Sequence, residues 1–203
     1  MMILDLVLFL ACLAFFHTSE FALAWIFNPS DLSRDSWLFS RHYCLAMGLA
    51  LSEYFCERAL APGWKRPSPV MWAGLLLVLL GEALRKAAIL TAGPSFTLDV
   101  KTHRRPHHHL VTRGVYRLCR HPGYLGWTLW CVGTQVLLRN VVCSAVFAAW
   151  SWKFFAHRIP YEETLLLEMF GERYRDYAAK TRLWLPFIES PCERTEHSEW
   201  PDL

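Results

Sequence analysis

Five long apolar stretches constrain this sequence more than any other feature. A helix needs about 20 predominantly apolar residues to cross the roughly 30 Å hydrocarbon core of a bilayer. Stretches of this kind cover residues 3–27, 43–60, 70–92, 123–138 and 141–156. Because only helices and closed barrels satisfy the backbone within lipid, the sequence predicts an all-α, polytopic integral membrane protein with about five transmembrane helices.

The last two stretches predict a tight antiparallel hairpin. Each has 16 residues, and only Arg139 and Asn140 separate them. Sixteen residues make about 24 Å of helix, so the hairpin would only just cross and would return the chain to its starting side. The first stretch has no basic n-region and no small-residue cleavage site, so we expect a membrane span there and not a cleaved signal peptide.

The composition excludes several protein classes. Hydrophobic residues make up 54% of the chain and charged residues 19%, against about 45–50% and about 25% in soluble domains. These values argue against a disordered chain, a nucleic-acid-binding domain and an ordinary soluble enzyme. The seven cysteines lie in apolar stretches without a C-x-x-C pair. We therefore expect small buried hydrophobic residues and no disulfide or metal framework.

Two polar blocks predict the orientation in the membrane. Residues 93–122 carry six basic residues, which are Lys101, Arg104, Arg105, Arg113, Arg117 and Arg120. The positive-inside rule places this block in the cytosol. The hairpin then brings residues 157–188 to the same side, and five spans put the N-terminus in the lumen. Lys65 and Arg66 oppose this orientation but are outnumbered. We expect a single membrane domain over residues 1–190 and a polar, disordered tail over 191–203.

Ionisable residues inside spans are costly and usually serve a purpose. Four lie near span ends, where we expect them to snorkel to the interface: Glu57, Arg58, Arg85 and Lys86. Three lie deeper, and paired structural residues are the favoured interpretation: Glu20, Glu53 and Glu82. A direct role in a site, or an ion or proton pathway, remains the alternative for these three.

The polar blocks contain the residues that can carry chemistry. Arg120, His121, Pro122, Gly123 and Tyr124 are consecutive where the first block enters the fourth span. Pro122 suits a first helical turn, and the free N-terminal amides there can meet an anion or a polar ligand. The three consecutive histidines at 107–109 do not predict a metal site, because adjacent side chains cannot share one face and no carboxylate or cysteine lies close by.

The second block predicts two further features. Arg158 and Glu162 are four residues apart and share a face if a helix continues through Pro160. A simple intrahelical salt bridge is the alternative to a functional role. Leu166, Phe170, Tyr174 and Tyr177 recur at spacings of three and four. This pattern indicates an amphipathic helix that lies on the membrane or on the other block, with packing as the favoured role.

Several motifs occur in a specific order along nearly the whole chain, roughly residues 16–188. They are HTSE at 17–20, GEALRKAAILTAG at 81–93, HHLVTRGVYRLCRHPGY at 108–124, LGWTLWCVGTQ at 125–135, FFAHRIPYEE at 154–163, FGERYRDY at 170–177 and LPFI at 185–188. Together they resemble the isoprenylcysteine carboxyl methyltransferase family. The HPxY and RxxxE parts alone are shared with a broader group of membrane methyltransferases.

The resemblance implies methylation of the C-terminal carboxylate of prenylated cysteine in CaaX-processed proteins. It implies S-adenosyl-L-methionine as cofactor and no metal. The implied location is the endoplasmic reticulum membrane, with the active site in a cap that faces the cytosol. The implied partners are the lipid bilayer and protein C-termini that carry farnesyl- or geranylgeranyl-cysteine, with no nucleic acid.

Carried over residue by residue, the resemblance assigns roles in the site. Cofactor binding falls on Lys101, His108, His109, Leu110, Val111, Tyr116, His121, Pro122, Gly123, Tyr124 and Glu162. Arg158 would bind the acceptor, and Arg158 and Glu162 would be the catalytic residues. Gly123 replaces a serine that is common in the family, and longer members carry additional N-terminal spans.

These residue types suit the implied chemistry. A C-terminal carboxyl has a pKa of about 3.5, so at pH 7 it is already a nucleophile and needs no general base. Arginine can hold a carboxylate with two parallel hydrogen bonds. Glu162 can bind the amino group of the cofactor or balance its positive charge. Two alternatives remain open: a phospholipid or other small-lipid methyltransferase, and a non-catalytic membrane scaffold or transporter.

Overall fold

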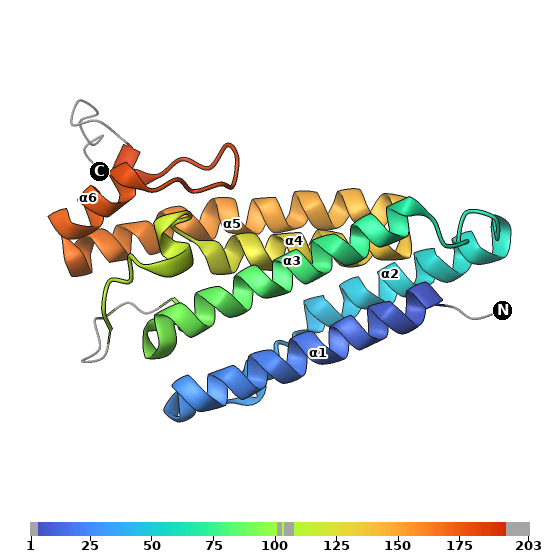
Figure 1. The fold of residues 1–203 in the computed structure, drawn as a ribbon, viewed down its shortest axis with the longest axis horizontal. Coiled ribbons are helices and arrows are strands. Elements are labelled where there is room, and N and C mark those ends of the chain that lie inside the picture. The colour runs from blue at the N-terminus through green and yellow to red at the C-terminus, as the bar shows by residue number, and fades with distance from the viewer. Residues whose placement is uncertain (1–3, 101–102, 104–107, 194–203) are drawn as a thin grey trace.

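The computed structural model describes residues 4–100, 103 and 108–193. Within those ranges the chain forms helices joined by loops and contains no strand, so the all-α prediction is confirmed. The helices are α1 (Leu4–Phe27), α2 (Arg41–Leu60), α3 (Pro69–Ala92), α4 (Pro122–Leu138), α5 (Val141–Phe170) and α6 (Glu172–Lys180). Figure 1 shows α1 to α5 running along the long axis, with α6 at one end. Five 3₁₀ turns complete the described part: η1 (Pro29–Asp31), η2 (Arg34–Trp37), η3 (Gly93–Ser95), η4 (Gly114–Arg117) and η5 (Pro191–Glu193).

The first four helices begin and end within two residues of the predicted spans, because strong local signals stop them. Ser40 and Ser68 cap α2 and α3, because the side chain of each accepts a hydrogen bond from the backbone amide of the third residue of its helix. Pro122 is the first residue of α4, as predicted. Arg139, with φ 58°, ends α4 and starts the tight turn into α5.

Helix α5 extends beyond the predicted fifth stretch. It has 30 residues, about 45 Å, and runs through Pro160 to Phe170. Proline removes only one hydrogen bond of the helix, and the turns on either side continue. The single helix predicted across Leu166–Tyr177 is wrong, because Gly171 has a φ of 56° and separates α5 from α6.

Helices α3 and α4 touch through glycines. Gly74 and Gly81 on α3 are seven residues apart, as are Gly126 and Gly133 on α4. A Cβ atom on Gly81 would lie 2.5 Å from the backbone nitrogen of Trp130, and one on Gly126 would lie 2.7 Å from that of Arg85. Small residues allow this close approach of backbones, which is a common way for helices to pack in membranes.

A charged cluster joins α1 to α3 inside the bundle. Arg85 donates two hydrogen bonds to the Glu20 carboxylate, at 2.8 and 2.7 Å, and Lys86 donates a third at 2.6 Å. Lys86 also lies 3.3 Å from Glu82. The snorkelling prediction for Arg85 and Lys86 is therefore wrong, whereas Glu20 has the expected paired structural arrangement.

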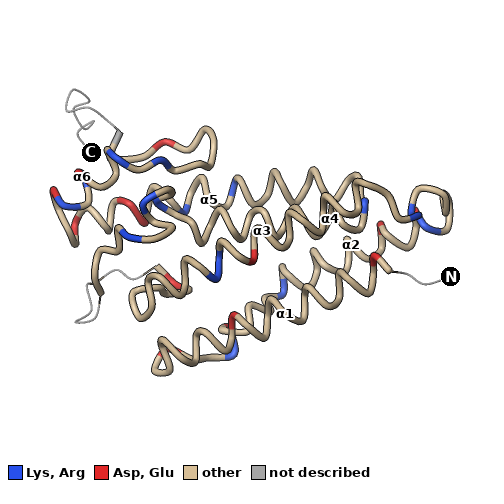
Figure 2. Tube along the Cα trace, viewed as in Figure 1, with Lys and Arg blue, Asp and Glu red and all other residues tan. Residues whose placement is uncertain are grey.

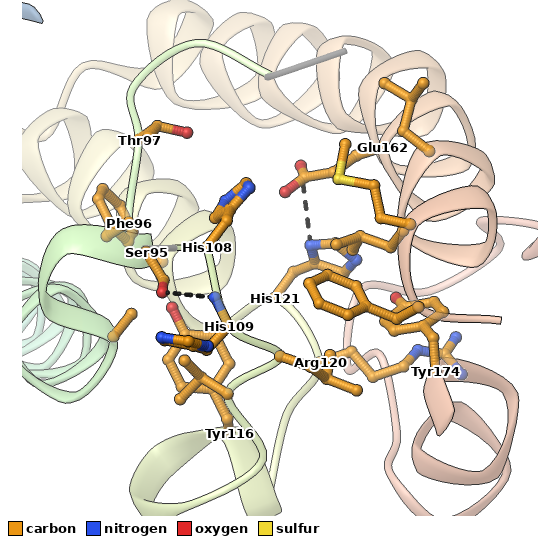
Figure 3. A pocket seen from close by; sticks show the side chains of 18 of the residues that line it. Ser95, Phe96, Thr97, His108, His109, Tyr116, Arg120, His121, Glu162 and Tyr174 are labelled. Atoms are coloured by element: carbon orange, nitrogen blue, oxygen red, sulfur yellow. Dashed lines mark hydrogen bonds and ion pairs between the residues drawn. The ribbon is translucent and has the colours of Figure 1, made fainter. Parts of the chain in front are cut away.

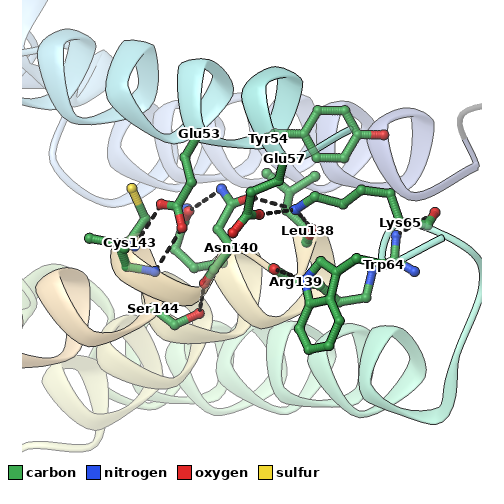
Figure 4. Close-up of polar contacts among 12 residues, drawn as sticks. Glu53, Tyr54, Glu57, Trp64, Lys65, Leu138, Arg139, Asn140, Cys143 and Ser144 are labelled. Atoms are coloured by element: carbon green, nitrogen blue, oxygen red, sulfur yellow. Dashed lines mark hydrogen bonds and ion pairs between the residues drawn. The ribbon is translucent and has the colours of Figure 1, made fainter. Parts of the chain in front are cut away.

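A second polar network surrounds the turn between α4 and α5 (Figure 4). Glu53 accepts hydrogen bonds from the backbone amides of Val142 and Cys143, both at 2.7 Å. Lys65 is buried and forms an ion pair with Glu57 at 2.6 Å, so Glu57 does not snorkel. Lys65, one of the two basic residues that opposed the predicted orientation, is thus paired with an acidic partner.

The distribution of charge and apolar surface is uneven. Figure 2 shows charged residues concentrated around α6 and its neighbouring loops at one end and around the α2–α3 connection at the other. By length and composition alone, α1 is the helix in the described ranges that could cross a membrane. All seven cysteines are free, but Cys44 and Cys56 are exposed, so the burial prediction is wrong for these two.

The glycine contact predicts a large effect of one substitution. In Gly126→Val, the added side chain would press on the backbone of α3, which cannot yield as a flexible side chain would. We expect a loss of about 1–3 kcal/mol or more in unfolding free energy, measured as a lower thermal midpoint in detergent. Gly48→Ala is the control, because a Cβ there meets nothing within 4 Å. Equal midpoints for Gly126→Val and the wild type would contradict the role of this contact.

Candidate active site

A cavity opens at the end of the bundle that carries α6. The empty space inside it is about 910 Å³, which includes the solvent at its open mouth. Figure 3 shows Ser95, Phe96, Thr97 and His108 on one side of the cavity and Glu162 and Tyr174 on the other. Segments distant in the sequence therefore meet here: the connection from α3 to α4, the start of α4, the second half of α5, and α6.

The structure brings most of the predicted site residues to this cavity. Ten of them line it, namely His108, His109, Leu110, Val111, Tyr116, His121, Pro122, Gly123, Tyr124 and Glu162. Arg158 is not part of the lining but contacts Tyr124 directly. Lys101 lies outside the described residues. The geometry gathers these side chains, and their roles in binding remain predictions.

The start of α4 is held in place from α3. His121 is the N-cap residue, and the guanidinium of Arg85 donates a hydrogen bond of 3.1 Å to the carbonyl oxygen of Gly123. A Cβ on Gly123 would lie only 3.0 Å from the Phe96 ring. Glycine at this position therefore lets Phe96 approach the cavity wall closely.

The hydroxyl of Tyr124 links the two residues predicted to be catalytic. It donates to Glu162 Oε2 and accepts a hydrogen bond of 2.8 Å from Arg158 Nε. Arg158 also donates to the carbonyl oxygen of Leu98 at 2.6 Å. Helix α5 continues through Pro160, so Arg158 and Glu162 do share a face. They meet through Tyr124, which distinguishes this arrangement from a simple intrahelical salt bridge.

Glu163, the neighbour of Glu162, holds the histidine of the motif. Its side chain is fully buried and lies 3.0 Å from Arg120 Nε and 3.2 Å from His121 Nε2. It also accepts hydrogen bonds from the hydroxyls of Tyr174, at 3.1 Å, and Ser190. One carboxylate therefore connects the α4 start, α6 and the segment after it.

The environment of Glu163 changes its acidity. Burial raises its pKa, whereas the hydrogen bonds from His121 and Ser190 and the charge of Arg120 lower it, and the net shift is downward. The carboxylate is therefore favoured in its charged form. The His121 ring, placed by this carboxylate, stacks on the Tyr124 ring with centroids 5.3 Å apart.

The sequence did not identify several residues of the cavity wall. Leu166, Phe170, Tyr174 and Tyr177 all line the cavity, and they also pack together in one buried cluster, as the favoured packing interpretation predicted. Their helical spacing was the available signal. Ser95 accepts a hydrogen bond of 3.1 Å from the backbone amide of His109, which ties the two parts of the α3–α4 connection together. Nothing in the local sequence around Ser95 indicates this contact.

Comparison with known proteins decides the family. The model of the isoprenylcysteine carboxyl methyltransferase (ICMT) family matches residues 73–168. Protein-S-isoprenylcysteine O-methyltransferase A of Arabidopsis thaliana is 49% identical over 180 residues, covering 88% of this chain and 91% of that protein. The chain belongs to the isoprenylcysteine carboxyl methyltransferase family.

Animal members and a solved structure of the family extend the comparison. The Rattus norvegicus protein-S-isoprenylcysteine O-methyltransferase is 42% identical over 183 residues, covering 89% of this chain and 64% of that protein. The structure of the eukaryotic intramembrane Ras methyltransferase ICMT superposes with a TM-score of 0.86 at 40% identity, covering 90% of this chain and 66% of that one. The chain thus shares the helical fold of an intramembrane family member.

The buried carboxylate of Glu163 should contribute much more to stability than that of its neighbour Glu162. Glu163→Gln would leave the buried Arg120 without its charged partner, so we expect a loss of about 3–5 kcal/mol in unfolding free energy and weaker cofactor binding through a displaced His121. Glu162→Gln, at a side chain that is 26% exposed, is the matched control and should unfold at nearly the wild-type temperature.

The same variant has a predictable pH dependence. The folded-state pKa of Glu163 lies below its ordinary value of 4.5. Its contribution to stability is therefore present above that value and is lost as the pH falls through the folded pKa. The difference in unfolding free energy between the wild type and Glu163→Gln should shrink as the pH falls below 4.5, the ordinary pKa of the group. A difference that stays constant down to pH 3 would contradict the assignment.

Proposed function

We propose that this chain catalyses transfer of a methyl group from S-adenosyl-L-methionine to the C-terminal carboxylate of prenylated cysteine. It is a protein-S-isoprenylcysteine O-methyltransferase, like the relatives that it matches over most of their length. One observation supports the proposed cofactor and acceptor. Ten of the predicted site residues line one cavity, and the Tyr124 hydroxyl links Glu162 to Arg158.

The lining of the cavity fits this cofactor. S-adenosyl-L-methionine carries a positive sulfonium, an amino group and an aromatic base, and it supplies an electrophilic methyl group. The Glu162 carboxylate balances positive charge, and the rings of Tyr116, Phe96 and Phe170 offer aromatic faces to cations and to the base. The backbone amide of Gly123, in the first turn of α4, supplies a hydrogen-bond donor at the cavity wall.

Arg158 is placed to hold the acceptor at the edge of the same cavity. Its hydrogen bonds to Tyr124 and Leu98 fix the guanidinium plane and use two of its five N–H groups. A carboxylate bound by this guanidinium lies close to the Tyr124 hydroxyl and therefore to the cofactor side of the site. Alignment and exclusion of water are what this reaction needs from the protein, because the carboxylate is ionised at pH 7.

The placement in the membrane follows from the same proposal. Helices α1 to α4 and the first half of α5 are five spans of one domain over residues 1–190, with the N-terminus in the lumen. Residues 93–122 and 157–188 form a cap on the cytosolic face of the endoplasmic reticulum membrane. This arrangement lets a polar cofactor enter from water and the prenyl chain enter from the bilayer. The ion pair between Lys65 and Glu57 supports this orientation, because a paired lysine in the lumenal loop does not count as an unbalanced positive charge.

The direct test is methyl transfer by the purified chain with a labelled methyl donor. We expect label on N-acetyl-farnesylcysteine and none on phosphatidylethanolamine offered in the same vesicles. Label on the phospholipid alone would replace the proposal with a lipid methyltransferase. Failure to bind the cofactor would indicate a non-catalytic membrane protein.

Arg158→Lys tests the acceptor site. Lysine keeps the charge but lacks the planar fork, so it would hold the carboxylate in a looser set of orientations. Such misplacement costs on the order of 100-fold in rate. We expect kcat on prenylcysteine to fall by about that factor while cofactor Kd stays near the wild-type value. Arg175→Lys on α6, whose side chain is 52% exposed, is the control. A near-normal kcat for Arg158→Lys would make Arg158 structural.

A further inference from the structure

The loop between α6 and η5 has an unusual distribution of polarity. Its residues 183–188 read LWLPFI, six successive apolar residues, and Arg182 and Glu189 flank them. Figure 1 shows this loop leaving the α6 end and folding back alongside α5 before it returns. The loop thus has a charged base next to the cap and an apolar tip that reaches along the helical bundle.

The two faces of the tip contact different surroundings. Leu183, Leu185 and Ile188 are buried in a cluster with Phe155 and Ile159 of α5. Trp184 and Phe187 face outward and are 61% and 91% exposed. Both have positive φ values, 65° and 57°, which are unusual for bulky side chains. The backbone therefore adopts a costly conformation that leaves most of the surface of two large aromatic side chains exposed.

Hydrogen bonds hold the loop against the bundle. The indole of Trp152 donates to the carbonyl oxygen of Pro186 at 2.8 Å. The indole of Trp184 donates to the carbonyl oxygen of Leu118 at 2.6 Å. The backbone amide of Arg120 donates to the carbonyl oxygen of Arg182 at 3.0 Å. Non-helical backbone can lie at membrane depth when its polar groups are satisfied by protein in this way.

The contact with Trp152 sets the depth of the tip. Trp152 is 11 residues beyond Val141, the start of α5, which is about 16 Å of helix. If α5 enters the bilayer at its start, a core of about 30 Å extends well past this level. The exposed apolar face of α5 also continues on both sides of it, through Val146, Trp150 and Phe154.

We propose that residues 181–190 form a membrane-inserted loop whose tip lies in the cytosolic leaflet, with Trp184 and Phe187 in contact with lipid. The occupant of this exposed aromatic surface is the bilayer, because the surface is continuous with the lipid-facing side of α5 and is bounded by charges at its base. Aromatic side chains are common at this depth of a membrane. The proposal rests on the membrane orientation given under Proposed function.

The loop also connects the bilayer to the site. Tyr124, Leu125 and Trp127 pack against the same cluster as Leu183 and Leu185. Insertion of the tip would therefore press the buried face of the loop against the residues behind Tyr124. Tyr124, which Arg158 contacts, is in this way supported from the membrane.

Spin labelling of the full chain in phosphatidylcholine nanodiscs tests the proposal. The background replaces by alanine the four cysteines that are not buried, which are Cys12, Cys44, Cys56 and Cys192. A nitroxide is then attached to Phe187→Cys, to Trp150→Cys on the exposed face of α5, or to Asp176→Cys on α6. Collisions with oxygen report lipid, and collisions with a water-soluble nickel chelate report water.

We expect the label at 187 to behave like the label at 150, with high oxygen and low nickel accessibility, and the label at 176 to show the reverse. A label at 187 that resembles 176 while 150 remains in lipid would overturn the loop proposal and leave the topology intact. Water accessibility at both 187 and 150 would instead overturn the span assignment. Shielding from both reagents with spin–spin broadening at 187 would show that a second copy covers the loop, which also overturns the proposal.

Discussion

The close contact between α3 and α4 is the constraint on which the rest of the structure depends. Glycines on both helices let the backbones approach to a distance that no other residue permits. This contact fixes the end of α3 beside the start of α4, so Arg85 reaches both Glu20 on α1 and the carbonyl oxygen of Gly123. The His121–Tyr124 segment is therefore positioned by the helical bundle as well as by its own loop.

Buried charges organise both ends of the bundle. Near the α4–α5 turn, Glu53 bonds to the first amides of α5 and Lys65 pairs with Glu57. Near the cavity, Glu163 joins Arg120 and His121. Burying an ion pair adds little net stability, but removing one partner is expensive. These clusters therefore specify geometry: each joins segments that must keep one relative position.

The hydroxyl of Tyr124 lies between two parts of the candidate site. On one side the cavity carries the features of a cofactor site, with Glu162, histidines and aromatic rings. On the other side Arg158 lies against Leu98 and Phe154, close to the apolar surface of α5. A reaction between a polar donor and a lipid-bearing acceptor needs such a boundary, because the two substrates approach from different solvents. Isoprenylcysteine carboxyl methyltransferases face this requirement at a membrane surface.

The sequence by itself determined the first four helices, the tight hairpin, Pro122 as the start of α4 and the shared face of Arg158 and Glu162, because capping, periodicity and proline geometry act over a few residues. It also carried the motifs of the family. Only the tertiary structure decided that Arg85 and Lys86 pair with Glu20, that Glu163 holds His121, and that Tyr174 and Tyr177 line the cavity. Those contacts join residues 11 to 66 positions apart, and they depend on how closely whole helices pack, which no local pattern encodes.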